Sequence, residues 1–309
     1  MKKNKKIADR KSLSFLRSFK KPVLKIFSES SLAYKVMHLK AIELDAKRRN
    51  ARKAKLMFDF SIVDSCNLNC ACCAAFSPLC KDVFLDIHIF ERDIKRIGEL
   101  TNGEIGYIRL AGGEALQHPK LIKFLEISRK YLRKGEIAIV TNGILLNEQD
   151  ANFWEVCNAN DIKIYVTPYP IKIDINRVVE VAKKKSVVME WFSVGDKNYF
   201  RKLPLNINGN FDINRNFKRC GNSNTCVVLR DGKMFACGMP AVIKYFNDYF
   251  GQNFKVSEKD YIDIHIASSI DEILDFVCKP IPFCRYCDVD NTQFGIKWSV
   301  SNKEIGEWM

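Results

Sequence analysis

The sequence predicts an α/β fold in which parallel strands, surrounded by helices, form a complete or partial barrel. From residue 56 onward, short runs rich in β-branched and aromatic residues alternate with segments of helical periodicity. A single helix between consecutive strands is the connection that joins parallel strands. The pattern repeats four or five times, and hydrophobic residues make up 47% of the 309 residues, enough for a large core.

Five strands are expected, and they span residues 56–63, 106–110, 136–140, 161–166 and 186–194. The helix after the first strand has Phe90 and Ile94 on one face, and the next helix is expected to have Pro119 in its first turn. Asp174 is expected to cap a helix that runs to about Lys184. In such barrels the functional residues come from loops at the C-terminal ends of the strands.

A second unit is expected after the barrel. Asp231-Gly232 predicts a β-hairpin turn, which would bring Cys220 and Cys237 together. The predicted organisation is a basic extension (1–55), a barrel core (56–195), a crossing segment (196–218), a cysteine-bearing unit (219–290) and a docking helix (291–309).

The positive charge of the chain belongs to its N-terminal extension. Residues 1–55 hold 18 of the 50 Lys and Arg residues and four of the 36 acidic ones, so the remaining residues hold 32 of each. The net charge of +14 therefore does not indicate a nucleic-acid partner, and none is expected. The extension fits a surface helix that binds an anionic membrane or a polyanion, or a solvated helix or tail, which is the commoner role of charge runs.

The sequence predicts a cytoplasmic protein. If the N-terminal extension binds lipid, the protein is expected at the inner face of the membrane. The sequence contains neither an apolar run of 18 residues nor the apolar region of a signal peptide. Twelve cysteines are too few for a disulfide scaffold and too many to be incidental. In a reducing compartment, clustered cysteines are expected to be metal ligands or catalysts.

Directly after the first predicted strand lies a C-x3-C-x2-C arrangement formed by Cys66, Cys70 and Cys73, with Cys72 inside it. Zinc sites favour paired C-x2-C elements, so the spacing fits zinc poorly. Three thiolates suit three irons of a four-iron cluster and leave the fourth iron free to bind another molecule. Cys72 stays an alternative to Cys73 as the third ligand.

This loop resembles the cluster-binding loop of radical S-adenosylmethionine (radical SAM) enzymes, which fold as a partial (β/α)6 barrel. Gly112, Gly113 and Glu114 resemble the family's GGE element after the second strand. The resemblance implies that the three cysteines hold a 4Fe-4S cluster whose open iron binds S-adenosylmethionine. It implies further that the glycines let the backbone approach the methionine part and that Glu114 accepts from its ammonium. Cys72 stands where the family commonly has an aromatic residue.

The same resemblance gives Asn142 and Thr167 a role. They end the third and fourth strands, where they would reach the ribose or sulfonium end of S-adenosylmethionine, or they are ordinary polar strand ends. In the family, an electron from a donor such as flavodoxin or ferredoxin reduces the cluster and the cofactor is cleaved. The resulting 5′-deoxyadenosyl radical abstracts a hydrogen atom from the substrate.

The C-terminal part contains a second set of cysteines, in the order C-x11-G-x4-C and then C-x2-C. By spacing alone zinc and iron–sulfur both fit four such thiolates. The pattern resembles the twitch domain, a shortened SPASM domain, which implies a second, auxiliary 4Fe-4S cluster. The expected ligands are Cys220, Cys237, Cys284 and Cys287, with Cys226 as the alternative to Cys220.

Four protein ligands leave no open iron, so an auxiliary cluster is suited to accept the electron left on a substrate radical. The predicted reaction is therefore a net oxidation or rearrangement of a small molecule or glycan. One alternative is a maturase that modifies a peptide substrate. Another is a non-catalytic iron–sulfur or zinc-binding module whose basic arm holds a polyanion, although such a module has no need of Gly112, Gly113 and Glu114.

Overall fold

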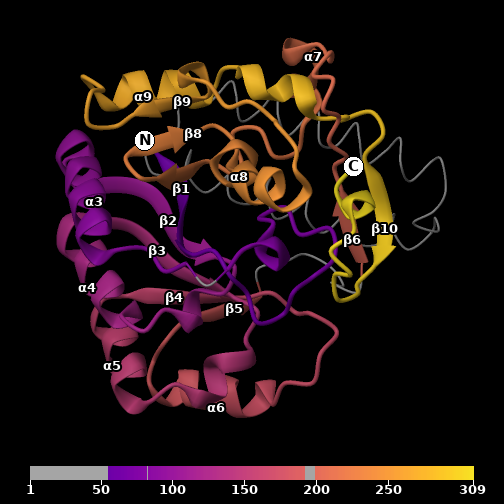
Figure 1. Ribbon diagram of the computed structural model, residues 1–309. Coiled ribbons are helices and arrows are strands. Elements are labelled where there is room, and N and C mark those ends of the chain that lie inside the picture. The colour runs from indigo at the N-terminus through magenta and orange to yellow at the C-terminus, as the bar shows by residue number, and fades with distance from the viewer. Residues whose placement is uncertain (1–54, 82, 192–198) are drawn as a thin grey trace, which may run out of the picture.

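The structure is a computed structural model that describes residues 55–309 except 82 and 192–198. Its main element is an eight-stranded sheet in the order β5-β4-β3-β2-β1-β7-β8-β9 (Figure 1). Neighbours from β5 to β1 are parallel. These strands are β1 (Met57–Val63), β2 (Glu104–Gly112), β3 (Lys134–Thr141), β4 (Ile162–Val166) and β5 (Met189–Trp191).

Helices follow the first four strands in turn and line one side of the sheet (Figure 1). They are α3 (Ile87–Thr101), α4 (Leu121–Tyr131), α5 (Ala151–Ala159) and α6 (Ile175–Lys184). Within the described residues, β5 and β9 end the sheet and do not pair with each other, so the barrel is open. The predicted α/β fold with a mostly parallel sheet is confirmed.

The core lies between the sheet and these helices because alternate strand residues point to that side. Phe58 and Phe60 of β1 are fully buried, and the Phe60 ring lies 4.9 Å from that of Phe90 in α3. Phe90 in turn lies 4.5 Å from Phe124 of α4. The opposite side of the same strands carries polar residues, among them Asp59, which leaves the inside of the barrel polar.

The predicted helix boundaries agree with the structure at one helix and differ at another. Asp174 accepts from the backbone N–H of Arg177 and caps α6, which ends at Lys184 as expected. Pro119, expected in the first turn of α4, instead precedes the helix, which begins at Leu121. The backbone N–H of Leu121 bonds the carbonyl of His118, so a tight turn occupies the predicted start.

The second unit continues the same sheet. Strand β7 pairs with β1 in parallel, and β8 and β9 follow in antiparallel order. Asp231 and Gly232 join β7 to β8 with φ angles of 49° and 75°, which confirms the predicted hairpin turn. The elements of this unit are α7 (Ile213–Arg219), β7 (Val228–Arg230), β8 (Lys233–Phe235), α8 (Gly238–Phe250), β9 (Tyr261–Asp263) and α9 (Ile270–Val277).

The predicted docking helix over residues 291–309 is wrong. The segment contains strand β10 (Gln293–Lys297), paired with β6 (Tyr199–Lys202), and a short 3-10 helix at Ile305–Glu307. Its apolar residues Phe294 and Ile296 alternate with polar ones, which is the period of a strand. The docking itself occurs, because Trp308 is only 3% exposed.

The basic extension at residues 1–55 lies, apart from Lys55, outside the described residues, and so does the surface proposed to bind membrane. The domain boundaries at residues 195, 218 and 290 stay predictions. No helix among the described residues has the length and apolar character needed to span a membrane.

Candidate functional site

The first cysteine loop, residues 64–73, leaves the C-terminal end of β1, where functional loops of such folds gather. Burial raises the pKa of Cys66 to about 11 and that of Cys70 to about 12, and the nearby Cys73 thiol adds to both shifts. Free thiolates are therefore disfavoured here unless a metal centre lies among them. Three soft ligands on one short loop, of which Cys70 is buried and the other two are half-buried, fit an iron–sulfur cluster.

Cys72 belongs to the same loop but has different neighbours. Its φ of 58° places its backbone in the left-handed region. The charged groups that bear most on its thiol are Lys202 and Glu307. The Cys73 thiol also bears on Cys72, but less than Lys202 and Glu307 do. Cys73 is among the main influences on both Cys66 and Cys70, whereas Cys72 is not.

Gly112 and Gly113 pack the end of β2 directly against the backbone that leads into the first cysteine loop. A Cβ on Gly112 would lie 2.0 Å from the carbonyl oxygen of Val63, and one on Gly113 would lie 1.9 Å from that of Ser65. Gly112 also has a φ of 138°, which favours glycine. Any side chain at these two positions would push the cysteine loop away from β2.

Glu114, the next residue, is fully buried and joins the loops that follow β2 and β3. Its carboxylate accepts from the hydroxyl of Thr141 (2.7 Å), the backbone N–H of Asn142 (2.8 Å) and that of Leu116 (3.0 Å). Burial raises the pKa of Glu114, and these donors oppose the shift. The carboxylate thus has three protein donors already, and its predicted contact with an ammonium stays a prediction.

Asn142 links the end of β3 to the first cysteine loop. Its side-chain amide donates to Oδ1 of Asn67 at 2.7 Å and lies 3.8 Å from Sγ of Cys66. Thr167 is buried at the end of β4, and its backbone N–H bonds the carbonyl of Thr141 at 2.9 Å. The predicted residues on the loops after β2, β3 and β4 therefore lie near one another. Thr167 follows β4, which is the strand of these three that is farthest from β1 and its cysteine loop.

Tyr169 belongs to this site, although nothing in the sequence indicated it. Burial raises the pKa of its phenol, and the thiols of Cys70, Cys73 and Cys66 raise it further. The ring stacks on Phe200 of β6, with centroids 6.0 Å apart and planes at 21°. Tyr169 thus joins the β4 loop to the two-stranded sheet above the cysteines.

Two tryptophans of the C-terminal segment also contact the first cysteine loop and were not predicted to do so. The indole N–H of Trp298 donates to Sγ of Cys70 at 3.2 Å, and that of Trp308 donates to the carbonyl of Cys73 at 2.8 Å. These residues lie more than 200 positions from the loop in the sequence. From the sequence, this segment was expected only to dock against the body as a helix.

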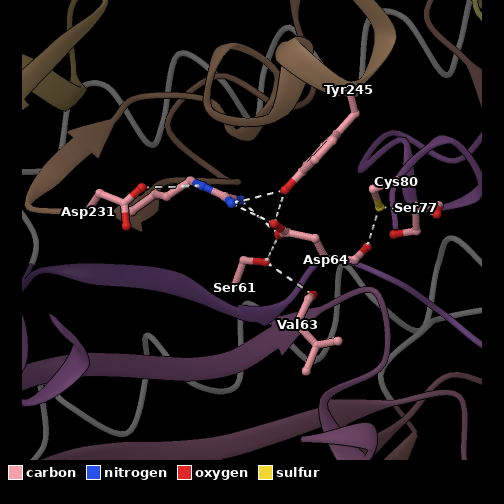
Figure 2. Close-up of polar contacts among 8 residues, drawn as sticks. Ser61, Val63, Asp64, Ser77, Cys80, Asp231 and Tyr245 are labelled. Atoms are coloured by element: carbon pink, nitrogen blue, oxygen red, sulfur yellow. Dashed lines mark hydrogen bonds and ion pairs between the residues drawn. The ribbon is translucent and has the colours of Figure 1, made fainter. Parts of the chain in front are cut away.

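Asp64 connects the start of the first cysteine loop to the second unit (Figure 2). It accepts from both terminal nitrogens of Arg230, at 2.8 and 2.5 Å, and from the hydroxyl of Tyr245 in α8. Burial raises the pKa of Asp64, but Arg230 and Tyr245 hold it below its ordinary value. Cys80 donates to the carbonyl of Asp64 at 3.0 Å and so supports the same turn.

The second set of cysteines surrounds one pocket, whose other lining residues are mostly apolar. Burial raises the pKa of Cys284 to about 12 and also raises the pKa of Cys287. The side-chain amide of Asn216 in α7 donates to the carbonyls of both residues, at 2.8 and 2.6 Å, and fixes their turn. The four cysteines that line the pocket are Cys220, Cys237, Cys284 and Cys287. We call them the pocket cysteines.

Cys226, the alternative to Cys220, does not line this pocket. Burial raises its pKa to about 11, and the charged groups that bear most on it are Asp59, Arg109 and Arg201. Asp59 and Arg109 pair across β1 and β2 on the inner side of the sheet, with 2.9 Å between Nη2 and Oδ2. Cys226 therefore lies between the pocket cysteines and the inside of the barrel.

No group of three His, Cys, Asp or Glu side chains placed to hold a single metal ion is found among the described residues.

Comparison with known proteins identifies part of the chain. The family model of the Radical SAM superfamily matches residues 60–190. A stretch of 88 residues is 34% identical to the GTP 3′,8-cyclase of Alkaliphilus oremlandii (strain OhILAs). That stretch covers 28% of this chain and 27% of the cyclase, so the match spans about a quarter of the curated relative.

Solved structures are similar at low identity. BtrN in complex with AdoMet and 2-DOIA has a TM-score of 0.46 and 16% identity, over 76% of this chain and 94% of BtrN. Native anSMEcpe with bound AdoMet and Cp18Cys peptide has a TM-score of 0.35 and 21% identity, over 44% and 42% of the two chains.

The family match begins within β1, and it includes the cysteines of the first loop, the GGE element and Asn142. The superfamily uses a 4Fe-4S cluster and S-adenosylmethionine. The order of these motifs along β1, β2 and β3, and their meeting at one end of the sheet, agree with that match. Residues 60–190 are therefore similar to the Radical SAM superfamily in sequence and in the order of these motifs.

Proposed function

We propose that the chain is a radical SAM enzyme with two iron–sulfur clusters that oxidises a polar small molecule or glycan. The observation that carries the proposal is the presence of two separate groups of buried or half-buried cysteines. One lies on the loop after β1 within the residues that match the Radical SAM superfamily, and the other surrounds a pocket in the second unit.

In this proposal Cys66, Cys70 and Cys73 hold the first cluster. When bound, the reduced cluster and S-adenosylmethionine supply a 5′-deoxyadenosyl radical that abstracts a hydrogen atom from the substrate. The chain supplies the ligands, keeps them away from water and fixes the loop that carries them. The close packing of Gly112 and Gly113 against this loop supports a site in which β2 and the cysteines keep a fixed distance.

The proposed cofactor site lies beside these cysteines. Asn142 contacts Asn67 and Cys66 while its backbone bonds Glu114, so one residue links the cluster loop to the GGE element. We assign Gly112 and Gly113 to the backbone surface that the methionine part approaches. Glu114 would accept from the ammonium through its carboxylate oxygen Oε2, which has a single protein donor. Thr167 is assigned to the ribose end.

The pocket cysteines are proposed to hold the auxiliary cluster. Four thiols around a pocket with an apolar lining complete the coordination of a cluster and leave no iron open to substrate. Such a site is suited to accept an electron, which makes the net reaction an oxidation. An external donor, such as flavodoxin or ferredoxin, must supply the electron that starts the reaction.

The inner side of the sheet supports a polar substrate. Closed barrels fill this space with branched apolar side chains. Here Asp59 pairs with Arg109, and Glu136 pairs with Lys163 at 2.7 Å, both on the inner side. A sugar, cyclitol or glycan can hydrogen-bond such groups, whereas a hydrophobic substrate would displace water from these charged pairs without replacing its hydrogen bonds.

The experiment that tests the proposal is cleavage of S-adenosylmethionine by the full chain. The protein is reconstituted anaerobically with iron and sulfide, then mixed with the cofactor and dithionite. We expect 5′-deoxyadenosine to accumulate over many minutes even without substrate, because uncoupled cleavage is slow. A reconstituted protein that contains iron and releases no 5′-deoxyadenosine would exclude the enzyme and favour a binding module.

The auxiliary cluster gives a separate prediction. The double variant Cys284→Ala/Cys287→Ala is expected to retain about half of the wild-type iron, because one of two four-iron clusters is lost. Release of 5′-deoxyadenosine should continue, since the first cysteine loop is unchanged. Cys278→Ala is the control, because Cys278 lies in the same unit but does not line the pocket.

Iron and sulfide analysis checks this outcome. Unchanged iron in the double variant would reject the pocket cysteines as cluster ligands. Zinc in the wild-type protein that disappears from the double variant would identify the pocket as a zinc site instead.

A further inference from the structure

We propose that Trp298 is a positioning residue that raises the reduction potential of the cluster on the first cysteine loop. The inference rests on the proposed function, because it takes Cys70 as a ligand of that cluster. The contact that carries it is the hydrogen bond from the indole N–H of Trp298 to Sγ of Cys70, at 3.2 Å.

Backbone pairing fixes the register of this hydrogen bond. Residues 298–301 run antiparallel to residues 69–71 and form an isolated bridge between Val300 and Cys70. The backbone N–H of Ala71 donates to the carbonyl of Ser299 at 2.9 Å, and that of Ser301 donates to the carbonyl of Asn69 at 2.8 Å. The indole is therefore positioned by two main-chain bonds beside its own side-chain bond.

A second indole holds the other end of the loop. Trp308 donates to the carbonyl of Cys73 at 2.8 Å and is buried against Phe76, Phe246 and Phe250. Its donor meets a peptide oxygen, whereas that of Trp298 meets a sulfur. Both tryptophans thus donate an indole N–H to the first cysteine loop. Trp298 donates to a sulfur atom and Trp308 to a carbonyl oxygen.

A hydrogen bond to a cluster thiolate stabilises the state that carries more negative charge, which is the reduced one. Reduction potentials of iron–sulfur clusters respond to such bonds and to solvent exposure. Cys70 is 7% exposed, so little water competes for its sulfur. The phenol of Tyr169 also acts on this thiol, so the indole is one of two polar groups beside the sulfur. No proton or electron is exchanged with Trp298 itself.

The test is a redox titration, monitored by electron paramagnetic resonance, of the reconstituted full chain. Trp298→Phe is expected to shift the midpoint potential of the first cluster to a more negative value. Trp308→Phe is the matched control and should leave the potential unchanged, because its bond ends on a carbonyl. One exchangeable-proton coupling to the reduced cluster that electron–nuclear double resonance detects in the wild type should be missing from Trp298→Phe, while the couplings of other donors remain.

A wild-type midpoint potential in Trp298→Phe, with iron content unchanged, would overturn the role of Trp298. If Trp298→Phe loses iron, the midpoint potential is measured instead with 3-benzothienylalanine at position 298. That residue keeps the shape of indole and lacks the N–H donor. A wild-type protein that holds no iron on the loop would overturn the proposed function and this role together. If the wild type cleaves S-adenosylmethionine and the potential is unshifted in the variants at position 298, this role alone would be overturned.

Discussion

Alanine at Cys73 should abolish release of 5′-deoxyadenosine, whereas alanine at Cys72 should preserve it. Mutation of a residue that hydrogen-bonds a metal ligand lowers activity about 10- to 100-fold. Loss of a ligand itself should therefore lower activity at least about 100-fold. The Cys73 thiol is among the main influences on both Cys66 and Cys70, whereas Cys72 is not, and Lys202 and Glu307 bear more on Cys72 than Cys73 does. The two variants change neighbouring cysteines of one loop, so the comparison tests which of the two thiols is the ligand.

The measurement is the initial rate of 5′-deoxyadenosine release with dithionite, normalised to iron content. Each variant also needs an iron determination, since Cys73→Ala should lose iron from the first loop and Cys72→Ala should not. Activity in Cys73→Ala together with its loss in Cys72→Ala would show that the ligand register is displaced by one residue.

The variant Asp64→Asn is expected to be less stable than the wild type by about 3 kcal/mol, within the range for removing one partner of a buried ion pair. Asp64 and Arg230 are 5% and 13% exposed, so the variant leaves a buried guanidinium without its counter-charge. The pair also ties the start of the first cysteine loop to β7. Urea unfolding of the anaerobically reconstituted chain, followed by circular dichroism, gives the change in free energy of unfolding.

Asp231→Asn is the matched control. Asp231 lies 3.8 Å from Nε of the same arginine but is 57% exposed, so its loss should cost at most about 1 kcal/mol. Because the folded protein lowers the pKa of Asp64, the stabilisation is present above the pKa of the unfolded carboxyl, near about 3.9, and is lost as pH falls further. Equal stability of wild type and Asp64→Asn at neutral pH would contradict the assigned role of the pair.

Local signals were sufficient for much of the fold. Asp174 and the hairpin residues Asp231 and Gly232 act through bonds and φ angles within a few residues, so their roles are readable from sequence. The cysteine spacings likewise identified which loops would carry thiols. Spacing alone left Cys220 and Cys226 as alternatives, and only the structure shows that Cys220 lines the pocket with the other three cysteines and that Cys226 does not.

The contacts that complete the site join segments far apart in the chain. Nothing near Trp298 indicates a thiol acceptor 228 positions away. The docking segment was expected to be a helix because Trp298, Ile305 and Trp308 are its evident apolar residues, but the period of two around Phe294 and Ile296 produces a strand.

The sequence assigned Gly112 and Gly113 to cofactor approach. The structure adds a second reason for glycine there, which is contact with the carbonyls of Val63 and Ser65. That contact depends on how β1 and β2 pair, so it could not be foreseen from either strand alone.

Two clusters in one chain are the core of the proposal, and Mössbauer spectroscopy with iron and sulfide analysis of the reconstituted wild-type protein tests them most directly. We expect about eight irons and eight sulfides per chain, all in four-iron clusters. One cluster should change its spectrum when S-adenosylmethionine is added, because only the first has an iron without a protein ligand. Zinc in either cysteine set, or spectra that S-adenosylmethionine leaves unchanged, would contradict the proposal.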